Sequence, residues 1–522
     1  MKNLRNLIKY LLIVLISGSL GLSCQDDFLD TVPTQEMSGA GLFATATGAL
    51  VPLNGIYRMM YTQGWSTTAN VQQCDGLTAW NLAADVMGED MVMKAQGSGW
   101  YWFDAIYSVK QSFTSSAWRS YDLWNGYYKL IANANYIIDA EETMEGTPGD
   151  INYVIGQGYA IRAYCYYQLV MWFARTYKGH ESDLGVPLYT EPSAAGTEGQ
   201  PRAPVSEVYA LIIQDINKAI ELLSADDVPA QKHRTHIDKY VASAIKARVC
   251  LTMEDWPGAE AAAKFARAGR SIGRGSDLTS GLNNVNLPNI LWGAELIQDH
   301  LPGWGPFLWH MDAFTQLPQE NYAFRAPKCI SVPLYGRMGA TDIRRQWWLP
   351  ENSISSYIQV KFRFTDPLGG GDKIWMRVEE MYLAEAEALC RQGNFVGARD
   401  LLTELVRTRD PNYTIIANDG NELGAQTWDL TNSLLEEIIF QRRIELWGEY
   451  GRTFDIKRLK QGFTRTAAMG WPSTALIEAV NTQNPETWAW ILTIPRHEFD
   501  GNDKLSELEI PEGDQNPVRL TP

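Results

Sequence analysis

Apolar residues recur at intervals of three and four along several long stretches of the chain, a spacing that places them on one face of a helix. Four such stretches lie in the first half of the sequence: Phe43–Tyr61, Tyr121–Ile138, Gly156–Trp172 and Val208–Leu223. A fifth, Leu434–Leu459, lies near the C-terminus. The pattern predicts a mainly α protein.

Two further segments are helical in pattern and also alike. Lys239–Arg270 contains KARVCLTMEDWPGAEAAAKFA, and Arg377–Arg409 contains AEALCRQGNFVGARDLLTELV. When they are aligned, alanines coincide, and an acidic or amide residue followed by an aromatic one marks the turn in both. This pattern, over a length of about 34 residues, is typical of a tetratricopeptide helix hairpin. The two copies are far apart, so we expect insertions between repeats and not a continuous solenoid.

The remaining stretches are irregular and rich in aromatic side chains. They have little helical period, hold many of the 19 tryptophans, and contain Pro and Gly throughout. Short extended pieces such as Tyr357–Phe364 predict a small sheet. We therefore predict a single domain after residue 23, a mainly α tetratricopeptide-like helical-repeat scaffold with a loop-rich insertion lobe. The repeats fall at about 120–270 and 377–460, and the lobe at about 65–104 and 271–372.

The first 23 residues are typical of an export signal and not of a folded element. Three basic residues precede an apolar run that is too short to span a membrane comfortably. The run ends in Gly21-Leu22-Ser23-Cys24, which looks like a lipoprotein cleavage site with Cys24 as the acylated first residue. Asp26-Asp27 directly after it resembles a signal for sorting to the cell surface. Acyl chains on Cys24 would anchor the protein firmly, because each buried CH₂ contributes about 0.8 kcal/mol.

Charge and cysteine content exclude several kinds of partner. The formal net charge is −16, and removal of the signal would make the chain more acidic still. Nucleic acid is excluded as a partner because its phosphates need a basic surface. Five cysteines remain after Cys24, widely scattered and without CxxC spacing, so neither full disulfide pairing nor a zinc site is expected. We expect most of them to be small buried residues.

Charged residues crowd the C-terminal helical stretch close to its apolar face. They are Arg442, Arg443, Glu445, Glu449, Arg452, Asp455 and Arg458. An unpaired buried charge costs several kcal/mol, so these side chains must pair with one another or with other segments. A structural ion-pair network is the favoured interpretation, and a polar catalytic site is the alternative.

The same residues carry a resemblance to a known family. The pattern Ile-x-x-x-Arg-Arg-x-Glu-Leu-x-x-Glu-x-x-Arg-x-x-Asp-x-x-Arg, starting at Ile438, is similar to the C-terminal signature of the SusD/RagB family. Gly185-Val186-Pro187-Leu188 and Ile494-Pro495-Arg496 also resemble family motifs, as does Gln515-Asn516-Pro517. Gln441 departs from the pattern, since the family usually has Glu there.

The resemblance implies a function as well as a fold. Members of this family are surface-anchored, non-catalytic lipoproteins of Bacteroidetes-type bacteria that bind nutrients. For this chain it implies a lipoprotein of the outer membrane that captures an oligosaccharide and passes it to a SusC-type TonB-dependent transporter. No cofactor or metal is implied.

Candidate ligand-binding residues come from the two loop regions. Aromatic faces bind sugars because the C–H groups of a pyranose present an apolar, slightly positive surface to the negative π face. Carboxylates then accept hydrogen bonds from the sugar hydroxyls, and side-chain amides both accept and donate them. The family's site is an aromatic cradle on such loops, so we expect ligand contacts from Trp100, Trp102, Trp304, Trp309 and Tyr322, with Asp90 among the polar partners. The alternative is that most of these rings fill the core of the lobe.

Signatures of catalysis are poor. There is no G-x-S-x-G elbow and no P-loop, and His233 and His236 lack a third metal ligand nearby. A glycoside hydrolase needs two carboxylates across a cleft, an arrangement that the sequence does not reveal. Two alternatives to glycan capture therefore stay open: capture of a peptide or another nutrient by the same fold, and a surface glycoside hydrolase.

Overall fold

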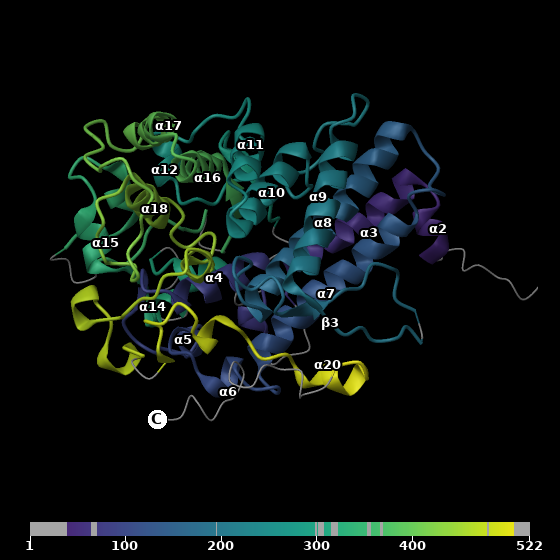
Figure 1. Ribbon diagram of the computed structural model, residues 1–522, viewed down its shortest axis with the longest axis horizontal. Helices are drawn as coiled ribbons and strands as arrows, with labels where there is room; N and C mark the ends of the chain where they lie inside the picture. The colour runs from purple at the N-terminus through teal and green to yellow at the C-terminus, as the bar shows by residue number, and fades with distance from the viewer. Residues whose placement is uncertain are drawn as a thin grey trace, which may run out of the picture.

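The structure is a computed structural model that describes residues 39–505, apart from 64–69, 195, 298–299, 301–306, 315–321, 352–355, 366–368 and 478–479. Three of the sequence-based expectations therefore lie outside the described residues: the export signal with Cys24, Trp304, and the closing motif at residues 515–517. The described chain is mainly helical, which confirms the predicted fold class (Figure 1).

The four helices predicted in the first half are present. They are α3 (Ala46–Met59), α7 (Trp118–Asp139), α8 (Pro148–Phe173) and α9 (Val205–Leu223). Helix α8 begins earlier than its apolar pattern because Thr147 caps it, accepting a hydrogen bond from Asp150 N. It lies between α7 and α9, and its side chains are buried along most of its length (Figure 1).

The two similar segments form helix hairpins, α10 (Lys239–Met253) with α11 (Trp256–Ala266) and α16 (Val378–Arg391) with α17 (Phe395–Arg407). The matching polar residues at their turns are N-caps: Asp255 accepts from Gly258 N at 3.1 Å, and Asn394 accepts from Gly397 N at 3.0 Å. The long insertion does not separate the hairpins in space, because α11 packs on α16.

The described strands are short and pair in three antiparallel two-stranded sheets. The pairs are β1 (Met91–Met93) with β5 (Lys328–Ile330), β2 (Leu184–Pro187) with β3 (Arg202–Pro204), and β4 (Ile290–Ala294) with β6 (Lys373–Arg377). The segment expected to be a small sheet around Tyr357–Phe364 contributes only isolated bridges, Ile358 to Cys329 and Gln359 to Trp348. The β1–β5 and β4–β6 pairings connect the insertion to segments outside it.

The other helices are shorter. The α-helices are α2 (Gly39–Phe43), α4 (Leu77–Met87), α5 (Trp102–Ala105), α6 (Val109–Ser112), α12 (Ser276–Thr279), α13 (Phe307–Met311), α14 (Tyr322–Arg325), α15 (Val332–Arg337), α18 (Leu434–Glu445), α19 (Arg452–Arg458) and α20 (Arg496–Gly501). Single 3₁₀ turns occur at Val71–Gln73, Ile343–Trp347, Ala467–Met469, Ser473–Ala475 and Trp488–Trp490.

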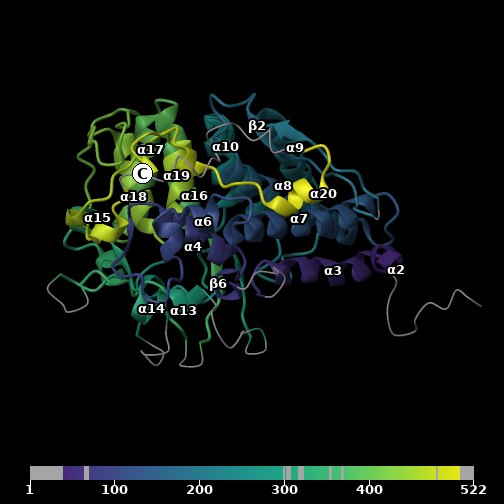
Figure 2. The same ribbon diagram turned by 90° about the horizontal axis from the view of Figure 1, so that it is seen from below.

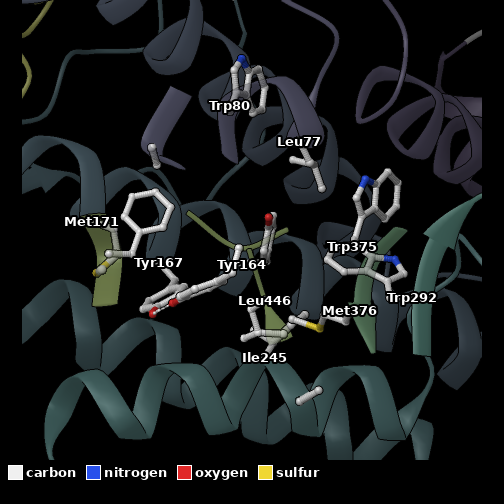
Figure 3. Close-up of a cluster of buried hydrophobic side chains, with 14 of the residues drawn as sticks. Leu77, Trp80, Tyr164, Tyr167, Met171, Ile245, Trp292, Trp375, Met376 and Leu446 are labelled. Atoms are coloured by element: carbon white, nitrogen blue, oxygen red, sulfur yellow. Dashed lines mark hydrogen bonds between the residues drawn. The ribbon is translucent and has the colours of Figure 1, made fainter. Parts of the chain in front are cut away.

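Aromatic residues form much of the core between the helices and the insertion (Figure 3). Trp292 of β4 and Trp375 of β6 meet edge to face with ring centroids 4.7 Å apart. Tyr164 of α8 packs against Trp292 at 5.1 Å. Some polar ring atoms have partners in this core, as where Trp80 Nε1 donates to Asp122 Oδ2 at 2.7 Å, whereas Trp375 Nε1 is buried without one among the described residues. Many of the tryptophans are therefore structural. The five cysteines after Cys24 are buried and free, as expected.

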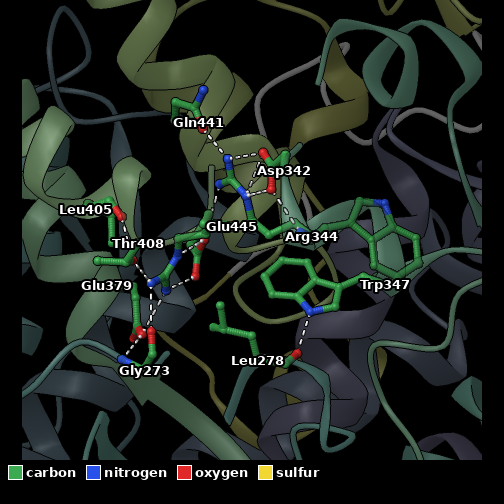
Figure 4. A network of polar contacts seen from close by, with 12 residues as sticks. Gly273, Leu278, Asp342, Arg344, Trp347, Glu379, Leu405, Thr408, Gln441 and Glu445 are labelled. Carbon is green, nitrogen blue, oxygen red and sulfur yellow. Dashed lines mark hydrogen bonds and ion pairs between the residues drawn. The ribbon is translucent and has the colours of Figure 1, made fainter. Parts of the chain in front are cut away.

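A buried ion-pair network centres on Glu445 at the end of α18 (Figure 4). Its carboxylate accepts hydrogen bonds from Arg409 Nη2 at 2.8 Å, Arg377 Nη1 at 3.0 Å and Arg344 Nη1 at 3.2 Å. Burial would raise the pKa of Glu445, but the three guanidinium groups hold it well below its ordinary value. The charged C-terminal stretch is thus a structural network, as the favoured interpretation required.

The network continues along α18 and α19. Asp455 accepts from Arg442 Nε at 2.8 Å and Arg458 Nε at 2.7 Å. Gln441, where the family has Glu, keeps a place in the network: its Oε1 accepts from Arg344 Nη2 at 2.6 Å. Replacement of Glu by Gln at this position therefore removes a charge without leaving Arg344 unbonded.

We predict that Glu445→Gln lowers the free energy of unfolding by about 3–5 kcal/mol, because three buried guanidinium groups lose their shared anion. Glu486→Gln is the matched control: Glu486 pairs with Arg175 at 2.9 Å on the surface, with 45% of its side chain exposed. Its loss is expected to cost less than about 1 kcal/mol. Urea denaturation of both variants measures the difference, and equal midpoints would contradict a structural role for the Glu445 network.

Candidate ligand-binding site

The sheet formed by β1 and β5 brings the two predicted loop regions together. Met91 is opposite Ile330 and Met93 is opposite Lys328. In an antiparallel pair, the residues that follow one strand run beside the residues that precede the other. The loop with Trp100 therefore meets the segment with Tyr322, although the two are distant in the sequence.

A glycine allows the two segments to touch. Gly97 has a φ of +53°, and a Cβ at this position would lie 2.7 Å from Arg325 O and 2.9 Å from Ala326 Cβ. A side chain would therefore separate the loop after β1 from the end of α14 and would also strain the backbone. Close contact at Gly97 holds the neighbouring aromatic rings in reach of one another.

Five rings form what we call the aromatic cluster: Trp100, Tyr101, Trp309, His310 and Tyr322. Tyr322 is its centre, with ring centroids 5.5 Å from Trp100, 6.2 Å from Trp309 and 5.2 Å from His310. Tyr101 meets His310 edge to face at 4.9 Å. Helices α13 and α14, which carry three of the rings, lie side by side at the edge of the molecule (Figure 2).

Exposure differs among the rings. Trp309 is only 7% exposed, whereas Trp100 and Tyr322 are half-buried and present part of their surfaces to solvent. Two further aromatic residues near them are more open: Phe314 is 40% exposed and Phe324 is 51% exposed. Sequence reasoning missed these two phenylalanines, although both lie in the loop region that it had singled out. Their exposure is the signal, and it is visible only in the fold.

Two of the expected ligand residues are buried and are not part of the aromatic cluster. Trp102, in α5, is 4% exposed and belongs to the hydrophobic core. Asp90 is 2% exposed and accepts hydrogen bonds from Arg443 Nε at 2.9 Å and Nη2 at 2.7 Å. In this fold the Asp90 carboxylate forms an ion pair with Arg443, which holds the residue directly before β1, and its role in ligand contact stays a prediction. Trp304 stays a prediction because it lies outside the described residues.

The polar atoms of the aromatic cluster are donors more than acceptors. Among the described residues, Trp100 Nε1 and the Tyr101 hydroxyl are buried without a hydrogen-bond partner. Such groups are uncommon in native proteins, where buried donors are nearly always satisfied. A ligand hydroxyl or a water molecule beside Trp100 would satisfy its ring nitrogen.

Lys328 is a buried amine behind the aromatic cluster. Its Nζ lies 5.8 Å from the centroid of Tyr101 and donates to Ala326 O at 3.1 Å, with no carboxylate in an ion pair among the described residues. Burial lowers the pKa of Lys328 to about 7. The charge is therefore costly to keep at neutral pH.

Three carboxylates in the described part of this region are engaged in structural contacts. Asp104 pairs with Arg119 at 2.8 Å, and Asp75 pairs with Lys373. Asp312 accepts from the backbone amides of Phe314 and Phe364. Within the described ranges, no group of three or more His, Cys, Asp and Glu side chains is placed to hold a metal ion. The described part of this site therefore offers aromatic surfaces and hydrogen-bond donors.

Comparison with known proteins identifies the family. Residues 66–251 match a family described as starch-binding and associating with the outer membrane, and residues 352–509 match the SusD family. The chain belongs to the SusD/RagB family.

Several relatives share the fold. SusD-like protein P2 of Formosa agariphila is 22% identical over 386 residues, covering 65% of this chain and 71% of that protein. A SusD-like carbohydrate binding protein from Bacteroides vulgatus superposes with a TM-score of 0.73 at 24% identity, covering 90% of this chain and 98% of that one. A SusD superfamily protein from Bacteroides fragilis gives 0.71 at 20% identity, covering 89% and 100%. The fold is that of the SusD superfamily.

We predict that Lys328→Met stabilises this SusD/RagB protein at pH 7 and flattens its stability–pH profile. The amine has a pKa of about 7 when folded and 10.5 ordinarily, so the unfolded chain binds more protons between these values. Stability contributed by this site thus rises with pH across that window, by at most about 1.4 kcal/mol per unit, and a methionine removes the dependence.

Lys373→Met is the control for this substitution. It removes the partner of buried Asp75, so it should destabilise the protein. Denaturant unfolding of the two variants and the parent at pH 7 and 9.5 measures both effects. A Lys328→Met variant that unfolds more readily than the parent at pH 7 would refute the assignment of an uncompensated charge.

Proposed function

We propose that the protein is a non-catalytic, cell-surface glycan-binding lipoprotein that captures an oligosaccharide and passes it to a SusC-type TonB-dependent transporter. The observation that carries this proposal is the aromatic cluster, where the loops after β1 and before β5 meet and Trp100 and Tyr322 are partly open. Membership of the SusD/RagB family and the similarity to a carbohydrate binding protein support it.

Recognition would rest on stacking. The open parts of Trp100 and Tyr322, together with Phe314 and Phe324, offer apolar surface to the C–H faces of a pyranose. The ring contacts to Trp309 and His310 hold Tyr322 in place before the ligand arrives, which reduces the ordering cost of binding. Trp304 remains a proposed further contact.

Capture and transfer require a modest affinity. Stacking on a few partly buried rings, without a charge pair, gives complexes that dissociate readily, and this suits a protein that must release its ligand to a transporter. Anchoring through an acylated Cys24 would keep the protein at the outer membrane, beside that transporter. No described helix is both long and apolar enough to cross a membrane.

The alternative functions have less support. A glycoside hydrolase needs a free carboxylate pair beside the sugar, whereas Asp75, Asp104 and Asp312 are each held by a cation or by backbone amides. A peptide would also bind to aromatic surfaces, and the experiment below separates it from a glycan.

We predict that Trp100→Ala and Tyr322→Ala each weaken oligosaccharide binding at least about tenfold, since stacking on an aromatic hot spot is worth more than about 1 kcal/mol. Tyr136→Ala is the matched control, because Tyr136 is 39% exposed on α7, away from the aromatic cluster. Isothermal titration against a glycan panel and a mixed peptide library gives the affinities, and thermal melting confirms that the variants fold.

Three outcomes of that titration would count against the proposal. Unchanged affinity in both cluster variants would reject the site, and binding of peptides alone would reject the ligand class. New reducing ends released from a glycan, and abolished by a carboxylate substitution, would reject the non-catalytic assignment.

We predict that Cys24→Ala moves the protein from the membrane fraction to the soluble fraction of the cells that express it. The thiol is the proposed site of acylation, and its acyl chains supply the membrane affinity. Fractionation followed by immunoblotting measures the distribution, with Cys74→Ala as a control because that cysteine is buried in the fold. Retention of the Cys24→Ala variant in the outer membrane would contradict lipid anchoring.

A further inference from the structure

A cleft of about 760 Å³ opens at the connection between α9 and α10. Residues 223–226, 228–234 and 238–240 line one side of it, and Tyr153 of α8, Arg270, Asn286 and Glu295 complete the lining. It shares no lining residue with the aromatic cluster. Its volume is that of a site for a small ligand, within the range of about 300–1,000 Å³ that ligand pockets occupy, and not that of a protein-docking surface.

The connection that forms the cleft is held in place by the surrounding elements. Arg234 O accepts from Gly293 N of β4 at 3.2 Å, and Thr235 O accepts from Trp292 Nε1 at 2.7 Å. Lys232 N donates to the Tyr153 hydroxyl at 3.0 Å, and that hydroxyl lies 2.7 Å from Nδ1 of buried His236. The backbone of the cleft is therefore fixed before a ligand binds.

Cationic side chains gather in this cleft, in a chain with a net charge of −16. The lining residues of this kind are Lys232, Arg234, Lys239 and Arg270, with His233 beside them. Lys232 Nζ lies over the ring of Tyr153 at 5.3 Å, and the Arg270 guanidinium lies over the ring of Tyr240 at 5.2 Å. The cleft thus combines positive charge with the partly exposed ring of Tyr240, whereas the ring of Tyr153 is buried.

The carboxylates of the lining do not neutralise Arg234. Asp238 is engaged twice: Oδ1 accepts from the backbone amides of Tyr240 and Val241, and Oδ2 pairs with Arg270 at 3.2 Å. Asp226 and Glu295 are exposed. Arg234 donates to Gln231 Oε1 at 3.3 Å and has no ion pair among the described residues. Burial and then the charge of Arg270 lower the pKa of Arg234, an effect that Asp238 opposes. Asp238 is therefore the partner of Arg270, and Arg234 is left without a carboxylate partner among the described residues.

We propose that this cleft binds the carboxylate or sulfate group of an acidic oligosaccharide between Arg234 and Arg270. A guanidinium group donates two parallel hydrogen bonds to either oxyanion. The partly exposed ring of Tyr240 supplies apolar surface for the sugar. The saccharide nature of the ligand rests on the proposed function, and the cleft adds selectivity for acidic glycans through a second site.

The test compares ligands that differ only in charge. Isothermal titration uses tetragalacturonate, its fully methyl-esterified form, a sulfated galactose tetrasaccharide and inorganic sulfate, with the mature chain. The variants are Arg234→Gln, Arg270→Gln and the surface control Lys178→Gln, whose side chain is 54% exposed. Arg234→Gln breaks no ion pair among the described residues, so it remains informative if Arg270→Gln melts at a lower temperature.

We expect Arg234→Gln to weaken binding of at least one acidic oligosaccharide about tenfold or more, and to reduce its dependence on salt, because a charge-assisted hydrogen bond is lost. The methyl ester should bind weakly and equally to all forms, and Lys178→Gln should match the parent. Comparing tetragalacturonate with the sulfated probe identifies which oxyanion is preferred.

Several results would overturn the proposal. They are unchanged affinity in Arg234→Gln, equal binding of tetragalacturonate and its methyl ester, binding of inorganic sulfate without either saccharide, and no binding of any acidic probe. A wrong assignment of the aromatic cluster as a ligand site gives a different result. Glycan binding would then be unaltered in Trp100→Ala and Tyr322→Ala, while Arg234→Gln would still weaken binding of the charged ligand and leave binding of the methyl ester unchanged.

Discussion

The pairing of one buried carboxylate, Glu445, with Arg344, Arg377 and Arg409 is the constraint on which the fold depends. These four residues come from distant parts of the chain, and the Glu445 carboxylate is buried with its charge because the three guanidinium groups surround it. Each arginine also pairs with a second carboxylate: Arg344 with Asp342, Arg377 with Glu449 and Arg409 with Glu379. The network therefore ties the insertion, β6, the end of α17 and α18 together.

The network also reaches the candidate ligand-binding site. Arg443 of α18 holds Glu89 and Asp90, the two residues directly before β1. Strand β1 pairs with β5, and that pairing brings the loop of Trp100 against the segment of Tyr322. A chain of contacts thus runs from the buried charges to the open rings. The exposed rings of the proposed site are thus positioned by contacts that begin in the buried interior.

Two kinds of recognition chemistry lie in separate places. The aromatic cluster offers apolar faces and unsatisfied donors near α13 and α14, while the cleft between α9 and α10 offers guanidinium groups. Stacking tolerates many sugars, whereas an oxyanion between two arginines demands a charged one. A protein with both would hold an extended glycan by its shape and select it by its charge.

The sequence by itself determined most of the helices, the hairpin repeats and the pairing of the C-terminal charges, because periodicity, turn residues and the cost of buried charge are local rules that residues obey wherever they lie. It also indicated which loops carry the aromatic residues. It did not show that the predicted helical stretch Leu434–Leu459 divides into α18 and α19. Only the tertiary structure decided which of those rings are open: Trp102 is buried, Phe314 and Phe324 are exposed, and Asp90 is occupied by Arg443. Exposure of a loop residue depends on which distant segment packs against it, and the pairing of β1 with β5, two short strands far apart in the chain, leaves no periodic trace in the sequence.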